Sequence, residues 1–154
     1  MLRISKLTDY ATVILSYMAR NRAQMHAAAE ISGVTGIALP TVSKILKVLT
    51  RSKVLSSTRG AKGGYVLAHA PDQISVARII SALEGPIALT ECSISDTTCR
   101  QSFTCEIRGN WGLINKAIEA ALESVTLADM ILPVDHHSGA EIKIPLQSLY
   151  GNTP

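Results

Sequence analysis

Residues 38–68, ALPTVSKILKVLTRSKVLSSTRGAKGGYVLA, decide the fold, because a helical pattern changes to a strand pattern within them. Pro40 stands where a helix begins, and the apolar residues after it recur at three- and four-residue spacing, as on one face of a helix. These residues are Val42, Ile45, Leu46 and Leu49. Beyond Lys53, two short apolar and β-branched runs flank a basic tip rich in glycine, which predicts a β-hairpin.

The residues before this stretch predict two more helices. Apolar and tyrosine residues at helical spacing indicate an amphipathic helix that starts near Ser5 or Thr8. They are Tyr10, Val13, Ile14, Tyr17 and Met18. A shorter helix is expected in HAAAEIS, residues 26–32, ended by Gly33, and the turn GVTGIA joins it to the Pro40 helix. Helix, glycine turn and helix form a helix-turn-helix outline, and the hairpin that follows takes the place of a wing.

Charge is unevenly distributed along the chain. The formal net charge is +3, yet residues 1–70 hold ten Lys and Arg against Asp9 and Glu30, a balance of +8. Residues 71–154 hold five basic against ten acidic residues, a balance of −5. A basic first half joined to an acidic second half predicts that the first half meets a polyanion, which for a helix-turn-helix protein is double-stranded DNA.

The Pro40 helix and the hairpin supply the candidate DNA contacts. Basic residues stand three and four apart on the polar face of the helix, and hydroxyl residues lie near its N-terminal end, where such helices touch base edges. At the hairpin tip, glycine lets the backbone approach a phosphate closely. The candidates are Thr41, Ser43 and Lys44 for bases, and Lys47, Arg51, Arg59, Gly60 and Lys62 for phosphates or the minor groove. A charged tip is also typical of an ordinary soluble turn, but the surrounding positive charge favours the DNA contact.

The second half predicts a short helix and a long one. Asp72 and Ser75 are placed to open the short helix, and Gly85 and Pro86 are placed to end it. Its packing residues are Val76, Ile79, Ile80 and Leu83. The long helix begins near Ile107. Its apolar stripe consists of Trp111, Ile114, Ile118, Ala121, Leu122 and Val125.

A long amphipathic helix at the end of a small domain needs a surface that buries its stripe, and a second copy of the chain supplies one. We therefore predict a homodimer. Thr126 and Asp129 resemble the capping box of a short last helix. Residues 132–154 have no steady period and are expected to form a mobile tail.

All three cysteines lie in one polar segment, ECSISDTTCRQSFTCE, residues 91–106. Cys92, Cys99 and Cys105 have the spacing C-x6-C-x5-C. Thiolates are the usual ligands of iron–sulfur clusters, and a loop of this length and polarity can wrap one. An odd number of cysteines in a reducing cytosol does not form a disulfide framework.

Three other interpretations of the cysteines remain open. Buried structural thiols are common in protein cores, but this segment is too polar for a core. A structural zinc ion would suit three thiolates and one further ligand, although zinc sites usually contain closer cysteine pairs. A thiol enzyme would need a cation or base to activate its nucleophile, for which Arg100 and Arg108 are the nearby candidates, and the segment lacks the redox C-x-x-C arrangement.

The hydrophobic residues, 47% of the chain, do not form a membrane-spanning run. The first twenty residues are interrupted by Lys6, Thr8, Asp9 and Ser16, so neither a signal peptide nor a transmembrane helix is expected. We therefore expect a cytoplasmic protein without a membrane partner.

The order of these features resembles the Rrf-type winged-helix regulators, the family that includes IscR and NsrR. The resemblance rests on the helix-turn-helix ALPTVSKILKVLTRSKVL, the wing SSTRGAKGGYVLA, the three cysteines and the long C-terminal helix, and it runs from residue 1 to about 131. The opening LRISKLTDYAT and the cysteine segment look most like the regulators of the SUF iron–sulfur assembly system.

The resemblance implies a mainly α fold with a small β-hairpin wing. It implies a winged helix-turn-helix DNA-binding domain in residues 1–84 with the wing near 55–68, a cluster-binding loop in 85–106, and a dimerisation helix region in 107–131. The protein would be a transcription regulator and not an enzyme, most plainly a repressor of iron–sulfur assembly genes. Its dimer would bind a roughly palindromic operator whose half-sites are one or two helical turns apart, on the order of 34 Å per turn.

The resemblance also implies the ligands of the cofactor, an iron–sulfur cluster of the [2Fe–2S] or [4Fe–4S] type. Cys92, Cys99 and Cys105 match the three thiolate ligands of the family. The state of the cluster would set the affinity for DNA.

The resemblance identifies the fourth ligand less directly than the three cysteines. The histidine of the IscR branch is replaced by Arg108, which cannot be deprotonated to bind iron. In the NsrR branch an aspartate in the first helix of the partner subunit completes the site, and Asp9 occupies the matching place. Glu91 and Glu106 are the alternative ligands. An acidic residue in the first turn of a helix is also favoured by the helix dipole alone.

Overall fold

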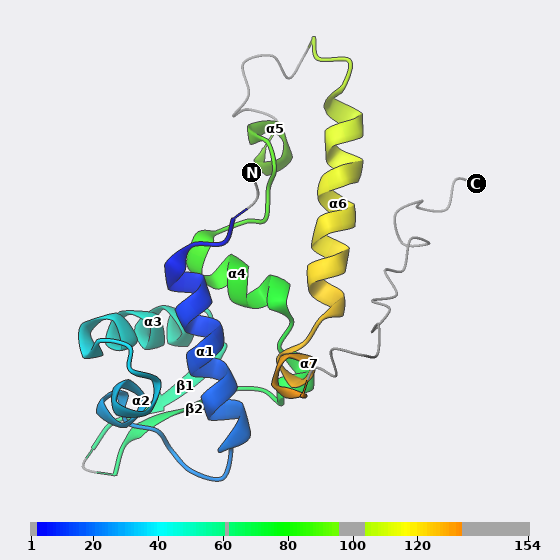
Figure 1. Ribbon diagram of the computed structural model, residues 1–154. Coiled ribbons are helices and arrows are strands. Elements are labelled where there is room, and N and C mark those ends of the chain that lie inside the picture. The colour runs from blue at the N-terminus through cyan, green and yellow to red at the C-terminus, as the bar shows by residue number, and fades with distance from the viewer. Residues whose placement is uncertain (1–2, 61, 96–103, 134–154) are drawn as a thin grey trace.

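The computed structural model describes residues 3–60, 62–95 and 104–133 (Figure 1). Its elements are α1 (Lys6–Arg20), α2 (Ala28–Thr35), α3 (Leu39–Arg51), β1 (Leu55–Thr58), β2 (Gly64–Leu67), the 3-10 turn η1 (Pro71–Gln73), α4 (Val76–Glu84), α5 (Glu91–Ile94), α6 (Arg108–Ser124) and α7 (Leu127–Ile131). The described part of the chain is thus mainly helical with a two-stranded antiparallel sheet, which confirms the predicted fold class.

The aliphatic core lies between α1, α3 and α4, with α2 and α7 packed against it. Helix α3 contributes the predicted residues Val42, Ile45, Leu46 and Leu49, each fully buried. Helix α1 buries most of the predicted face, because Ile14 and Met18 are buried and Tyr10 and Tyr17 pack against the core half-buried. Val13 departs from the prediction, since it is 45% exposed while the neighbouring Leu15 is fully buried. Val13, Ile14 and Leu15 are consecutive, so their spacing leaves open which of them face inward, and packing against neighbouring helices decides it.

Helix termini follow local capping chemistry. Ser5 accepts a hydrogen bond from the Thr8 amide at 3.2 Å and caps α1, as the sequence indicated. The prediction that Gly33 ends α2 is wrong, because α2 continues to Thr35. Gly36 ends it with a positive φ of 71°, and its amide donates to the Ser32 carbonyl at 3.0 Å.

The wing is an antiparallel hairpin in which Leu55 faces Leu67 and Thr58 faces Gly64. Gly63 needs to be glycine, because a Cβ atom there would lie 2.9 Å from the Gly60 carbonyl oxygen. The hairpin also has a third backbone partner. His26 donates its amide to the Tyr65 carbonyl at 3.0 Å and accepts the Tyr65 amide at 2.9 Å.

Of the two residues predicted to open α4, only Ser75 lies at its start. Ser75 caps it by accepting the Arg78 amide at 3.2 Å, as expected. Asp72 lies in η1 and is not part of the helix start, which corrects that prediction. Gly85 ends α4, and its amide donates to the Ser81 carbonyl at 3.2 Å.

Figure 1 shows α6 extending from the helical body on the side opposite the wing. Its lower end is held by backbone hydrogen bonds from Val76 to Val125 and from Leu127 to Ile74, both 2.8 Å. Thr126 caps α7 together with Asp129 in the predicted capping box. Helix α7 then packs on α1 with Leu127 fully buried. The expected tail lies outside the described residues beyond Pro133.

The short helix α5 was not predicted, because the whole segment 85–106 was interpreted as a loop. Its four residues contain Cys92. None of the helices described is both long enough and apolar enough to cross a membrane.

Candidate nucleic-acid interface

The exposed face of α3 carries the predicted helix contacts. Lys44, Lys47 and Arg51 are exposed, and Thr41 and Ser43 are half-buried near the N-terminal end. The opposite face of α3 is fully buried, so the helix is rigidly seated. Such a helix presents its first turns to a groove without having to be ordered on binding.

The tip of the wing is exposed and basic. Arg59, Gly60 and Lys62 are all exposed. Gly60 has a φ of 119°, and its carbonyl accepts the Gly63 amide at 2.9 Å, which closes the turn. Arg59 precedes this turn and Lys62 lies within it, so both cations are at the tip of the wing.

A small cavity of about 140 Å³ joins α3 to the wing. Its lining combines the predicted Lys47 and Arg51 with Thr50, Ser57 and Tyr65, which the sequence did not single out. Ser57 and Tyr65 face each other across the hairpin. The pairing of the two strands was therefore the signal from which their common position could have been predicted. Two cations beside hydroxyl groups form a surface suited to a phosphate.

The turn between α3 and the wing contains a strained residue. Lys53 has a φ of 58°, which is uncommon for a side chain other than glycine. Its carbonyl accepts a hydrogen bond from the Arg78 guanidinium of α4 at 3.1 Å. This hydrogen bond connects the turn between α3 and the wing to α4, the helix that precedes the cysteine segment.

Two of the three cysteines fall within the described residues. Cys92 lies in α5 and Cys105 lies shortly before α6, and both are half-buried free thiols. The Cys92 sulfur is 3.1 Å from the Thr90 hydroxyl, which is also 2.9 Å from the Ser93 hydroxyl. Cys99 lies outside the described residues.

The segment that leads to Cys92 is anchored on α6 by a buried amide. Asn115 is 7% exposed, and its side chain donates to the Ile87 carbonyl and accepts the Leu89 amide, each at 3.0 Å. Asn115 was not predicted to have a role, since a polar residue inside a helical stripe has no distinguishing mark in the sequence. It fixes the start of the cysteine segment relative to α6.

The predicted fourth ligand, Asp9 of the partner subunit, lies on α1. Asp9 is exposed in the first turn of α1, where the helix dipole favours it. Glu91 and Glu106 are exposed next to the cysteines. Among residues 3–60, 62–95 and 104–133, no three His, Cys, Asp or Glu side chains gather closely enough to hold a metal ion.

Next to Asp9, a carboxylate links α1 to the end of α4. Glu84 accepts the Ser5 amide at 2.8 Å and the hydroxyl of the buried Thr8. The hydrogen bond from Thr8, followed by that from Ser5, lowers the pKa of Glu84 below its ordinary value. The start of α1 is thus fixed to the helix that leads into the cysteine segment.

An apolar surface lies where the start of α1, the end of α4 and α6 meet. A groove of about 430 Å³ lies between the start of α1, the end of α4 and α6. Its apolar lining includes Ile4, Ile80, Ile87, Leu89, Ile118 and Leu122. Farther up α6, Trp111, Leu113 and Ile114 are between 37% and 48% exposed. Exposed apolar surface of this kind on a helix marks an interaction face.

Comparisons with known proteins agree with this arrangement. The model of the Rrf2 family, described as an iron-dependent transcriptional regulator, matches residues 4–133. Protein rrf2 of Nitratidesulfovibrio vulgaris is 35% identical over 102 residues, which are 66% of this chain and 68% of that protein.

Two solved structures have the same fold. CymR, the global cysteine regulator of B. subtilis, superposes with a TM-score of 0.66 at 29% identity over 85% of this chain and 97% of CymR. IscR of T. potens superposes with a TM-score of 0.63 at 28% identity over 84% of this chain and 86% of IscR. The chain therefore belongs to the Rrf2 family and is a winged-helix transcriptional regulator, not an enzyme.

Proposed function

We propose that this protein is a homodimeric repressor that senses an iron–sulfur cluster and controls genes of iron–sulfur cluster assembly. The observation that carries the proposal is the placement of the thiols: Cys92 and Cys105 are free and half-buried at the two ends of the segment that contains Cys99. The description of the family as iron-dependent supports the same function.

DNA binding is assigned to α3 and the wing. Thr41, Ser43 and Lys44 would read base edges, since they lie in the first turns of an exposed, rigidly seated helix. The phosphate contacts would come from Lys47, Arg51, Arg59, Gly60 and Lys62. Since DNA is the target, the protein would act in the cytoplasm, on a roughly palindromic operator.

Dimer formation is assigned to α6. Trp111, Leu113 and Ile114 are exposed at the upper end of the helix, above the groove that Ile118 and Leu122 line. A second copy would cover this face by pairing the two long helices, in keeping with the symmetry of most homodimers. The winged helix-turn-helix body would then comprise residues 1–84, and the dimerisation region would comprise residues 107–131.

Cys92, Cys99 and Cys105 would hold the cluster, with Asp9 of the partner subunit as the proposed fourth ligand. The donor set fits such a group by its chemistry, because free thiols ligate iron as thiolates and a carboxylate is an oxygen donor that exchanges more readily. When bound, the cluster would supply a group whose stability depends on iron, oxygen and redox state. Asn115 would hold the backbone that leads to Cys92, and the Thr90 hydroxyl would contact the Cys92 sulfur.

The coupling to DNA would run through contacts already in place. Glu84 joins the first turn of α1, which contains Asp9, to the end of α4. Arg78, also in α4, holds the turn between α3 and the wing through the Lys53 carbonyl. A change at the cysteine segment would therefore alter the placement of both DNA-contacting elements. Coupling energies of about 1–3 kcal/mol, or 5- to 150-fold in affinity, are typical of such linkage.

The test is to purify the protein without oxygen and measure iron, acid-labile sulfide and zinc per chain. Iron with sulfide and a broad visible absorption band supports the cluster, and Cys99→Ala is expected to remove this absorption. Asp9→Asn should shorten the lifetime of the band in air, and the matched exposed variant Asp72→Asn should not. A colourless protein with stoichiometric zinc would overturn the sensing function and leave only DNA binding.

A second function is favoured by one observation, the likeness to CymR, a cysteine regulator. In that case the free thiols of Cys92 and Cys105 would respond to oxidation directly, without a metal. No iron after reconstitution, together with operator affinity that changes on thiol oxidation, would favour this function over the first.

A further inference from the structure

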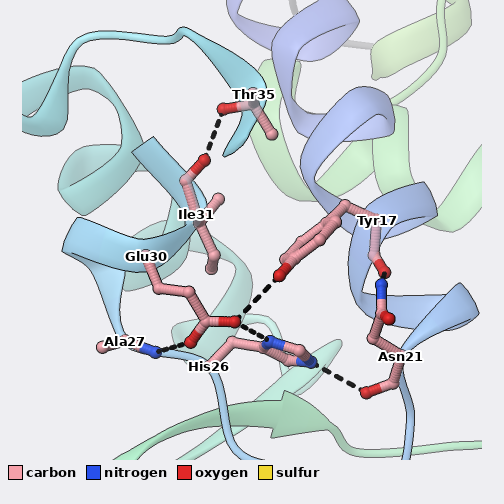
Figure 2. Close-up of polar contacts among 7 residues, drawn as sticks. All are labelled: Tyr17, Asn21, His26, Ala27, Glu30, Ile31 and Thr35. Carbon is pink, nitrogen blue, oxygen red and sulfur yellow. Dashed lines mark hydrogen bonds and ion pairs between the residues drawn. The ribbon is translucent and has the colours of Figure 1, made fainter. Parts of the chain in front are cut away.

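A buried histidine connects the helix-turn-helix to the wing. His26 is 1% exposed, between α1 and α2. Its Nδ1 atom lies 3.0 Å from the Glu30 carboxylate and its Nε2 atom lies 2.9 Å from the Asn21 carbonyl oxygen (Figure 2). The Tyr17 ring meets the imidazole edge-on with 5.2 Å between ring centroids.

Both ring nitrogens of His26 thus face oxygen atoms. A neutral imidazole has a single N–H, so it can donate to one of these oxygens and must direct a lone pair at the other. The Asn21 carbonyl can only accept. If both hydrogen bonds form, His26 and Glu30 together must hold one proton more than a neutral imidazole and an ionised carboxylate do.

That proton belongs on the histidine. Glu30 already accepts the Tyr17 hydroxyl at 2.8 Å and the Ala27 amide at 3.3 Å, as Figure 2 shows, and three donors favour a carboxylate over a carboxylic acid. The hydrogen bond from His26, followed by that from Tyr17, lowers the pKa of Glu30. An ionised Glu30 leaves His26 as the group with two N–H donors.

The backbone of the same residue supports the wing. His26 exchanges two hydrogen bonds with Tyr65 of β2, at 3.0 and 2.9 Å. Gly64 approaches so closely that a Cβ atom there would lie 2.9 Å from the His26 carbonyl oxygen. Tyr65 in turn lines the cavity that contains Lys47 and Arg51. The position of His26 therefore sets the position of the wing relative to α3.

We propose that His26 is a positioning residue whose two ring nitrogens both donate, one to Glu30 and one to the Asn21 carbonyl, and that this paired ring fixes the wing so that operator affinity falls when the donors are lost. The proposal rests on the proposed DNA-binding function only for the affinity. Removal of the ring leaves the Asn21 carbonyl and the Glu30 carboxylate without these donors at the point where the segment meets β2.

The other charged groups around His26 do not change this assignment. Tyr17 of α1 donates to Glu30 and is neutral, with its pKa raised by that hydrogen bond. Arg22 and His69 line a cavity of about 370 Å³ beside His26, and both are exposed, so water and salt screen them. Tyr65 meets His26 through its backbone. Glu30 is the charge in direct contact.

The first test reads the ring itself, without DNA or cofactor. ¹⁵N NMR of imidazole-labelled protein at pH 7 is expected to show two protonated nitrogens for His26, and in Glu30→Gln one protonated and one pyridine-type nitrogen. A pyridine-type nitrogen on His26 of the wild type at pH 7 would overturn the proposal, whatever the protein does with DNA.

The second test compares operator affinities at one pH and constant salt. His26→Gln lacks the two ring N–H donors in their fixed positions and is expected to bind the operator roughly tenfold more weakly than the wild type. The control Gln73→Ala, at an exposed position beside the same cavity, should keep the wild-type affinity. Wild-type affinity in His26→Gln would overturn the link to the wing. If no variant binds DNA, faster hydrogen exchange of the Tyr65 amide in His26→Gln than in the control reports the same release.

Discussion

The side-chain oxygen of Asn115 in α6 accepts the backbone amide of Leu89 at 3.0 Å. The same carboxamide donates to the Ile87 carbonyl. It thus makes one accepted and one donated hydrogen bond with the backbone, as a residue of a neighbouring strand would. Leu89 lies just before α5 and Cys92. One buried amide therefore decides where the cysteine segment begins.

Removal of this amide is expected to loosen the segment. In Asn115→Ala, the Leu89 amide and the Ile87 carbonyl lose their partner, which should lower the free energy of unfolding by about 1–3 kcal/mol. Urea denaturation measures this change, and iron content after reconstitution should fall with it. Asn110→Ala, an exposed position in the same helix, is the control. Equal stability of the two variants would contradict the role of Asn115.

Glycine 63 is expected to be essential for the wing, and Gly33 is not. In Gly63→Ala, the added Cβ atom would lie 2.9 Å from the Gly60 carbonyl oxygen, so the tip must open and operator affinity should fall roughly tenfold, about 1.4 kcal/mol. In Gly33→Ala, the methyl group meets nothing within 4 Å inside α2, and stability should rise by about 0.5–1 kcal/mol. Gel-shift and thermal unfolding assays separate the two effects.

Glu84 is expected to make stability depend on acid. Because the Thr8 and Ser5 hydrogen bonds lower the pKa of folded Glu84, its stabilisation is present above the unfolded pKa of 4.5 and is lost as pH falls through the lower folded value. Glu84→Gln should be less stable than the wild type at neutral pH, and the difference should shrink below about pH 4.5. Urea unfolding at both pH values tests this. Glu119→Gln, at an exposed position in α6, should show no such convergence.

The basic residues of α3 are expected to set the salt dependence of DNA binding. Lys47→Ala and Arg51→Ala should each reduce the slope of log affinity against log salt by about 0.9, the value for one lost phosphate contact. Fluorescence anisotropy at several salt concentrations measures the slope. Lys116→Ala, in α6, should leave it unchanged. A slope that Lys116→Ala reduces equally would place the DNA elsewhere.

Much of the fold could be predicted because the signals are local. The buried residues of α3, the hairpin around its glycine tip, the Ser5 and Ser75 caps and the Thr126 capping box all depend on groups within about four residues of one another. The end of α2 shows the limit of such signals, because it was predicted at Gly33 and lies at Gly36. Either glycine can end a helix, so the sequence does not decide between them until the length of α2 is known.

The sequence by itself determined the winged helix-turn-helix, the basic residues of α3 and the wing tip, and the grouping of the cysteines, since periodicity, charge and spacing are properties of the chain. Only the tertiary structure decided that α1 buries Leu15 rather than Val13, that Asn115 holds Leu89 across 26 positions, and that Glu84 holds Thr8 across 76. It also decided that His26 is enclosed against the wing strand. A polar side chain becomes buried and paired only when distant segments pack around it, so its role depends on contacts that no local pattern contains.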